Sequence, residues 1–168
     1  MPVLRRPARH TPVLLITVGL LLTGCAAPAQ RIEFGPDDTL KAAQRLVTDR
    51  CLIRQGLTPP RPGGASPSPD RASRISDALF GTGRAELSLT LPGGHVISQH
   101  TDGCLAAAQR RLYGDQRRWF RVSTSMANLR SAAPLADRTE YRLLREDALQ
   151  RARTLLTEAA YAQKGNRS

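Results

Sequence analysis

The sequence predicts a mainly helical α+β domain with four helices, one β-hairpin and a proline-rich internal loop. Two observations predict this fold. Apolar side chains recur every three or four residues in several segments, which is the spacing of a buried helix face. In one central segment they alternate with polar side chains, which is the spacing of a strand. The length of 168 residues is enough for one ordinary domain.

The first helix is predicted between residues 35 and 55. Asp37 or Asp38 is the expected N-cap, and Gly56 is expected to end the helix. The apolar stripe of this helix, spaced three, four and four residues apart, consists of Leu40, Ala43, Val47 and Cys51.

Residues 58–70 contain five prolines and two glycines among thirteen residues. This composition is incompatible with a helix or a central strand. The segment is therefore predicted to be a flexible, partly extended loop inside the domain. A short helical turn at residues 73–80 is expected to follow it.

A β-hairpin is predicted from the alternating segment at residues 85–91, a Pro-Gly-Gly turn at residues 92–94 and a return strand at residues 95–100. Two registers remain open at this point. A two-residue loop would place Val96, Ser98 and His100 on the face of the leucines. A three-residue loop would place His95, Ile97 and Gln99 on that face instead.

Three further helices are predicted in the C-terminal half. The first has Thr101 or Asp102 as its cap and continues to residue 113, where Gly114 and Asp115 break the chain and cap the next helix. The second covers residues 116–130, with the apolar stripe Trp119, Val122, Met126 and Leu129. The third covers residues 136–162, with the stripe Tyr141, Leu144, Ala148, Ala152, Leu155 and Ala159. Its expected surface ion pairs are Arg142/Glu146 and Asp147/Arg151.

The N-terminal segment has the pattern of an export signal. Residues 1–10 contain three arginines and no acid, and an apolar run follows from residue 13 to residue 22. The next residues, Leu22-Thr23-Gly24-Cys25, resemble the lipobox of bacterial lipoproteins. This resemblance implies cleavage of the signal before Cys25 and a lipid on the sulfur of that residue. The alternatives are an ordinary signal peptide with a chance cysteine, and an uncleaved anchor.

The lipobox implies a division of the chain into four parts. These are a lipoprotein signal peptide (1–24), a lipidated tether (25–35), a single extracytoplasmic domain (36–162) and a frayed tail (163–168). Two acyl chains on one residue are enough for stable anchoring, because each buried CH₂ group contributes about 0.8 kcal/mol. The expected location is the extracytoplasmic face of the cell membrane.

Export also bears on the remaining cysteines. When Cys25 carries lipid, Cys51 and Cys104 are left with one intramolecular pairing, and disulfides persist outside the cytoplasm. Closing a loop of this length stabilises a domain by about 4 kcal/mol in the chain-entropy model. Two reduced, buried thiols are the alternative.

A second resemblance concerns the domain. The segment Asp102–Ala108 and the Leu112-Tyr113-Gly114 element after it resemble segments of uncharacterised secreted lipoproteins of actinobacteria. In those proteins an earlier Cys-x-x-x-x-Gly-apolar element, here residues 51–57, ends a first helix. The resemblance supports the disulfide and the helical architecture, and it implies no activity.

Positive charge is the main candidate for a binding function. The formal net charge is +11 for the whole chain and +8 for the 144 residues that would remain after cleavage. Export argues against nucleic acid as the partner, so the expected ligands are anionic lipid head groups or wall polymers. The alternative is an arginine-rich face that is merely solvated. The candidate contact consists of Arg110, Arg111, Arg117, Arg118 and Arg121.

Catalysis has weaker support in the sequence. His95, His100 and Asp102 lie within eight residues and could form an acid–base or metal set. However, the two histidines are five residues apart on a strand and point to opposite faces, and Asp102 is expected to cap a helix. No catalytic residue, metal or cofactor is therefore predicted. The expected function is non-catalytic binding or scaffolding at the cell envelope, with an envelope protein as a candidate partner. An envelope enzyme centred on these three residues is the alternative.

Overall fold

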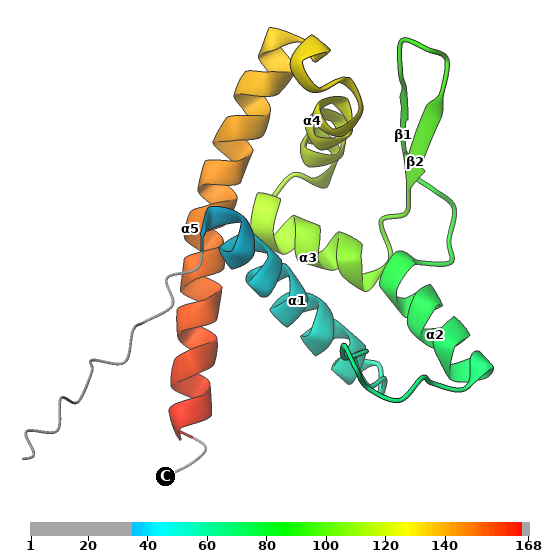
Figure 1. Cartoon of the computed structure of the whole chain (residues 1–168), viewed down its shortest axis with the longest axis vertical. Coiled ribbons are helices and arrows are strands. Elements are labelled where there is room, and N and C mark those ends of the chain that lie inside the picture. The colour runs from blue at the N-terminus through cyan, green and yellow to red at the C-terminus, as the bar shows by residue number, and fades with distance from the viewer. Residues whose placement is uncertain (1–34, 166–168) are drawn as a thin grey trace, which may run out of the picture. The chain divides into compact units, whose positions relative to one another are not determined.

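The computed structural model describes residues 35–165, so the predicted signal peptide, Cys25 and nearly all of the tether lie outside the described residues. The mainly helical α+β prediction is confirmed, with five α-helices in the described residues instead of four. In chain order the elements are α1 (Pro36–Arg54), α2 (Pro69–Phe80), β1 (Leu87–Thr90), β2 (Val96–Gln99), α3 (Cys104–Tyr113), α4 (Gln116–Leu129), the 3₁₀ turn η1 (Arg130–Ala132) and α5 (Leu135–Gly165) (Figure 1). In the described residues, no helix is both long enough and apolar enough to span a bilayer.

The additional helix is α2. It begins at Pro69, inside the predicted loop, and replaces the short turn that was predicted at residues 73–80. Proline suits the first turn of a helix because its missing N–H is not needed there and its φ angle already fits. Asp70 also lies in this first turn, where a carboxylate interacts favourably with the helix dipole. The loop prediction was wrong at this point because it treated each proline as a helix breaker.

The main core lies where α1, α3 and α4 pack against α5, the long helix at the left of Figure 1. Trp119 of α4 stacks on Tyr113 of α3 with ring centroids 3.5 Å apart, and its ring centroid lies 5.4 Å from that of Tyr141 on α5. Most residues of the predicted stripes of α1 and α5, and Trp119 and Val122 of the α4 stripe, thus meet in one cluster. Its buried members are Leu40, Ala43, Leu112, Tyr113, Trp119, Val122, Leu144, Ala148, Ala152 and Leu155.

A second apolar cluster surrounds the disulfide between Cys51 and Cys104, which joins α1 to the first residue of α3. The Cα atoms of the two residues are 5.7 Å apart, and Cys104 is fully buried. The amide Nε2 of Gln55 lies 3.4 Å from the Cys104 sulfur. The predicted pairing is confirmed. The bond closes a segment of the chain that contains α2 and the whole hairpin.

The sequence left two registers open for the hairpin. The structure has the one with a three-residue loop. Leu89 lies opposite Ile97 and Leu87 opposite Gln99, so Ile97 and Gln99 share the face of the leucines. Two backbone bonds close the turn: the Leu91 N–H donates to the His95 carbonyl, and the Gly94 N–H donates to the Leu91 carbonyl. Gly94 has a φ of +81°, which favours glycine and is typical of a three-residue hairpin loop.

The helix termini differ from the predictions in several places. The N-cap of α1 is Gly35, not Asp37 or Asp38, which lie in the first turn. The N-cap of α3 is Gly103, not Thr101 or Asp102, and it makes no side-chain cap bond. The last helix continues to Gly165 and so includes the first half of the predicted tail.

One of the two surface ion pairs predicted on α5 forms. Arg142 bonds Glu146 at 3.1 Å. Arg151 does not pair with Asp147 but donates to the carbonyl oxygen of Leu112 at 2.8 Å, near the C-terminal end of α3. A cation suits this position because the last carbonyl groups of a helix carry partial negative charge.

Candidate functional site

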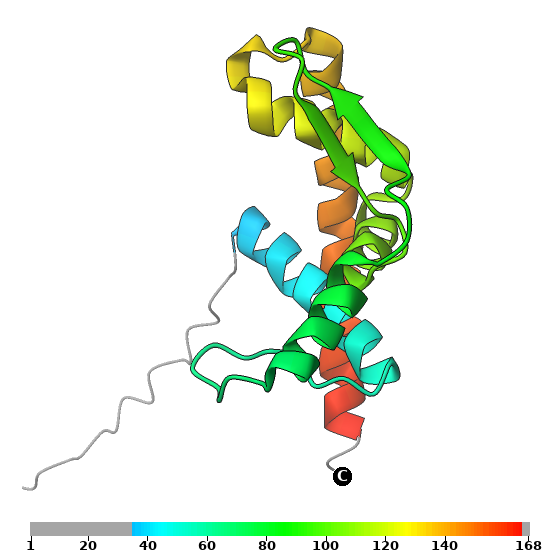
Figure 2. The same cartoon turned by 90° about the vertical axis from the view of Figure 1, so that its right-hand side faces the viewer.

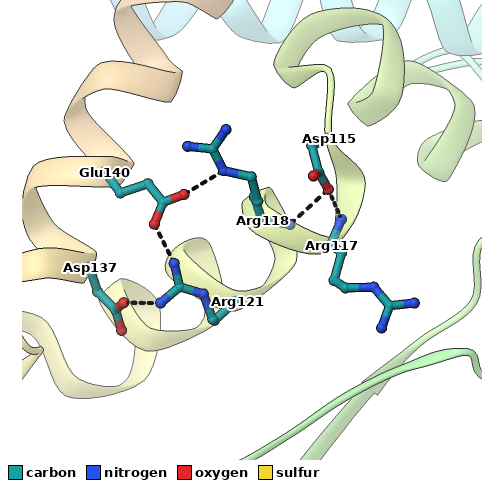
Figure 3. Close-up of polar contacts among 6 residues, drawn as sticks. All are labelled: Asp115, Arg117, Arg118, Arg121, Asp137 and Glu140. Carbon is teal, nitrogen blue, oxygen red and sulfur yellow. Dashed lines mark hydrogen bonds and ion pairs between the residues drawn. The ribbon is translucent and has the colours of Figure 1, made fainter.

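The predicted arginine contact lies on α3 and α4, and three of its five members, Arg110, Arg118 and Arg121, are bound internally. Arg118 and Arg121 are one turn apart on α4 and face the first turns of α5, where Asp137 and Glu140 lie (Figure 3). Arg118 Nε donates to Glu140 Oε1 at 2.7 Å. Arg121 bridges both acids, with one nitrogen on Asp137 and another on Glu140.

This network holds α4 to α5. The Asp137 side chain is only 12% exposed, so its carboxylate depends on Arg121 for much of its polar environment. The hydrogen bond from Glu140, followed by the charge of that carboxylate, raises the pKa of Arg118 above its ordinary value. Arg118 and Arg121 therefore tie two helices together, although their side chains remain about half exposed.

A third arginine of the set, Arg110, is also occupied. Its Nη1 donates to the backbone carbonyl of Thr101 at 2.6 Å and to the side-chain oxygen of Gln116 at 2.8 Å. These bonds join the end of the hairpin segment to α3 and to the start of α4. Arg110 is thus a link between elements, although its side chain remains exposed.

Arg111 and Arg117 are the two members that stay available. Both are exposed, and within residues 35–165 neither guanidinium has a hydrogen-bond or ion-pair partner. In Figure 3 the Arg117 side chain points away from the acids of α5. Asp115, its nearest acid in sequence, caps α4 by accepting from the backbone N–H groups of Arg117 and Arg118 at 2.9 and 3.0 Å. Of the five arginines in the predicted contact, Arg111 and Arg117 are thus the two whose guanidinium groups make no polar contact within the described residues.

The three candidate catalytic residues are not brought together. His95 lies at the hairpin turn, and His100 follows the other end of β2. Five residues of extended chain span about 17 Å, and the odd spacing places the two side chains on opposite faces. His100 and Asp102 do lie near each other, at the junction of the hairpin with α2 and α3.

Asp102 has a structural role that the sequence did not predict. Its Oδ2 accepts from the backbone N–H groups of Thr82 and Gly83, at 3.2 and 2.9 Å, in the loop after α2. The bond from Gly83 is the main cause of a lowered pKa for this carboxyl group. The backbone of the Gly-Thr-Gly segment at residues 81–83 thus binds an anionic group, which is the Asp102 carboxylate of the same chain.

Two glycines allow this junction to close. A Cβ atom on Gly103 would lie 2.4 Å from the carbonyl oxygen of Leu79, and one on Gly81 would lie 1.9 Å from Asp102 Oδ1. Both distances are shorter than any ordinary contact. Since the atoms near Gly103 belong to the backbone of residues 79–81, the start of α3 approaches the end of α2 this closely only because Gly103 has no side chain, whereas Gly81 is favoured by its φ of +89°. In the described residues, no group of three or more His, Cys, Asp or Glu side chains is arranged to hold a metal ion.

Sequence reasoning missed the acid partners of the arginines and the partner of Asp102. A signal existed for the first: Asp137 and Glu140 are three residues apart, so they lie on one face of their helix, as do Arg118 and Arg121. No local signal existed for the second, because Asp102 and Gly83 are 19 residues apart.

Comparisons of the chain with protein-family models, curated proteins and solved structures gave no match.

Proposed function

We propose that the chain is a lipid-anchored protein of the bacterial cell envelope, whose domain acts by binding or scaffolding instead of catalysis. The observation that carries the proposal is Leu22-Thr23-Gly24-Cys25, placed directly after an arginine-containing start and an apolar run. The Cys51–Cys104 disulfide supports the compartment, because disulfides persist outside the cytoplasm and are rare within it.

The proposal includes an anionic contact made by Arg111 and Arg117. A lipid anchor on Cys25 would hold the domain close to phospholipid head groups and anionic wall polymers. Each arginine near an anionic surface contributes about 1 kcal/mol. A pair of them cannot anchor a protein alone, but it can favour one orientation of a domain that is already tethered.

The test of the anchor is the intact mass of the protein purified from native membranes, with and without reduction. We expect a chain that begins at Cys25 and carries two or three acyl chains, and a gain of about two daltons when the disulfide is reduced. Cys25→Ser should abolish the lipid mass and membrane retention. The matched control, Cys51→Ser with Cys104→Ser, should keep the lipid mass and lose only the response to reduction. An unlipidated chain that starts at Met1 would overturn the proposal.

The test of the arginine contact is binding to vesicles that contain anionic phospholipid, compared with neutral vesicles, at low salt. Arg111→Gln with Arg117→Gln removes two exposed, unpaired charges. The control, Arg45→Gln with Arg50→Gln, removes two exposed charges from α1. We expect the first pair to weaken binding more than the second. Equal weakening would mean that only the net charge matters and would refute a contact at Arg111 and Arg117.

A further inference from the structure

The two outer edges of the hairpin are open. Leu91 and His95 form a hydrogen-bonded pair, and pairs in an antiparallel ladder alternate between hydrogen-bonded and not. The pairs Thr90/Val96 and Ser88/Ser98 are therefore the ones whose N–H and C=O groups point outward. All four of these residues are exposed, and within residues 35–165 their outward backbone groups have no partner.

The two edges are not equivalent. β1 packs against α4. β2 reaches a helix through Gln99 at its end, where Gln99 Nε2 donates to Gln109 Oε1 of α3 at 2.5 Å. Val96, at the start of β2, keeps 60% of its surface exposed. Figure 1 places the hairpin on the side of the domain away from α5, and in Figure 2 the hairpin lies in front of the helices.

β2 has one of the devices that normally prevent pairing at an edge, its short length of four residues, but its sequence lacks the others. Natural edge strands carry charged residues, prolines or bulges that block the approach of another strand. The sequence of β2 is Val-Ile-Ser-Gln, with no charge and no proline. Its backbone groups can therefore be satisfied by an extended strand, which is the ligand that such an edge selects.

We propose that the occupant of this edge is β2 of a second copy of the chain, paired antiparallel across a two-fold axis at Ile97. In this register Val96 lies opposite Ser98 of the other copy, and Ser98 lies opposite its Val96. All the outward groups of Val96 and Ser98 are then used, in four backbone hydrogen bonds. Ile97 lies opposite its own symmetry mate, so that two apolar side chains meet on the leucine face.

Self-pairing suits this strand because its edge is self-complementary. In a two-fold contact the same surface of each copy forms the interface. A charged residue at its centre would therefore face the same charge on the other copy. β2 has none, although the whole chain is strongly basic. An edge of four residues buries little area and belongs to the weak class of interfaces. Pairing is therefore expected to depend on concentration, which a shared membrane raises.

The pairing rests on the hairpin and does not require the lipid anchor, although the anchor would strengthen it. The test is a cysteine at the axis. Ile97→Cys, in the full chain in its native membrane, should form a disulfide-linked dimer under mild oxidation, because directly opposite Cβ atoms lie about 4.5–5.5 Å apart. The matched control is Leu89→Cys, which has the same face and similar burial but lies on β1 directly opposite Ile97. It should give little dimer.

A second pair of variants tests the edge without relying on the cysteine alone. In the Ile97→Cys chain, Val96→Lys should lower the yield of dimer about fivefold, because a lysine on an edge strand hinders pairing and the two new charges would lie diagonally across the axis, each opposite Ser98 of the other copy. Thr90→Lys, at the position opposite Val96 in the hairpin, should leave the yield unchanged. Retention of the Cys51–Cys104 bond, read from the mass, shows that each variant has folded.

The outcomes separate this inference from the proposed function. The same experiment on purified Cys25→Ser chain, at high protein concentration, should still give the dimer if only the anchor is wrong. Equal dimer from Ile97→Cys and Leu89→Cys, or none from either, would overturn the pairing. So would an Ile97→Cys adduct whose mass shows a different protein, because the edge would then serve a heterologous strand.

Discussion

Removal of the Cys51–Cys104 disulfide is expected to cost about 4 kcal/mol of the free energy of unfolding. The two cysteines are 53 residues apart in the chain, and the chain-entropy model assigns about this value to a closed loop of that length at 25 °C. The stability of a whole domain is about 5–15 kcal/mol. The bond therefore accounts for a large share of the stability of this one.

The perturbation is Cys51→Ala with Cys104→Ala, which keeps two small apolar side chains in the cluster around Leu52. The assay is equilibrium unfolding in urea of the Cys25→Ser chain, followed by far-ultraviolet circular dichroism. With a urea dependence of about 2 kcal/mol per molar, which is ordinary for a small domain, the midpoint should fall by about 2 M. Reduction of the chain that keeps both cysteines should lower the midpoint similarly.

A loss below about 1 kcal/mol would refute this reasoning. It would mean that the segment between the cysteines stays close to its native compactness in the unfolded chain, so that the covalent bond restricts little. A much larger loss of unfolding free energy in the alanine variant than after reduction would indicate that packing of the sulfur atoms contributes to stability. The Gln55 amide also contacts both sulfurs.

The remaining predictions use the same unfolding assay. Gly103→Ala should lower the free energy of unfolding by about 1–3 kcal/mol, because the new Cβ would lie 2.4 Å from the Leu79 carbonyl oxygen; an unchanged midpoint would contradict that contact. Asp102 has a lowered pKa in the folded state, so its contribution is present above its ordinary pKa of 3.8 and is lost as pH falls through the folded value. Asp102→Asn should therefore lose less stability than the unaltered chain between pH 5 and pH 2, and equal losses would contradict the role of this carboxylate. Arg121→Gln should cost about 1 kcal/mol, whereas Arg117→Gln should stay within about 0.5 kcal/mol. Equal effects of these two arginine variants would contradict the network on α5.

The candidate site was only partly predictable from the sequence. Arginines between residues 104 and 130 could be recognised from composition, and the pairing of the two cysteines followed from their number once Cys25 was assigned to lipid. Which arginines remain available could not be predicted, because that depends on acids supplied by α5, at sequence distances of 16 to 22 residues. The open edge of β2 was likewise hidden, since it depends on the register of the hairpin and on which strand a helix contacts.

Local pattern determined most of the helices. The stripes of α1, α4 and α5 are encoded in apolar spacing, because a helix repeats every 3.6 residues whatever it packs against. The hairpin was likewise marked by alternation and by Pro-Gly-Gly. Tertiary structure decided what this spacing does not specify, namely that Ile97 and Gln99 share the face of the leucines. It also decided that Asp102 binds the Gly83 N–H instead of capping a helix. These outcomes depend on which groups meet across the fold, and the energy of such contacts is set by partners that are distant in the sequence.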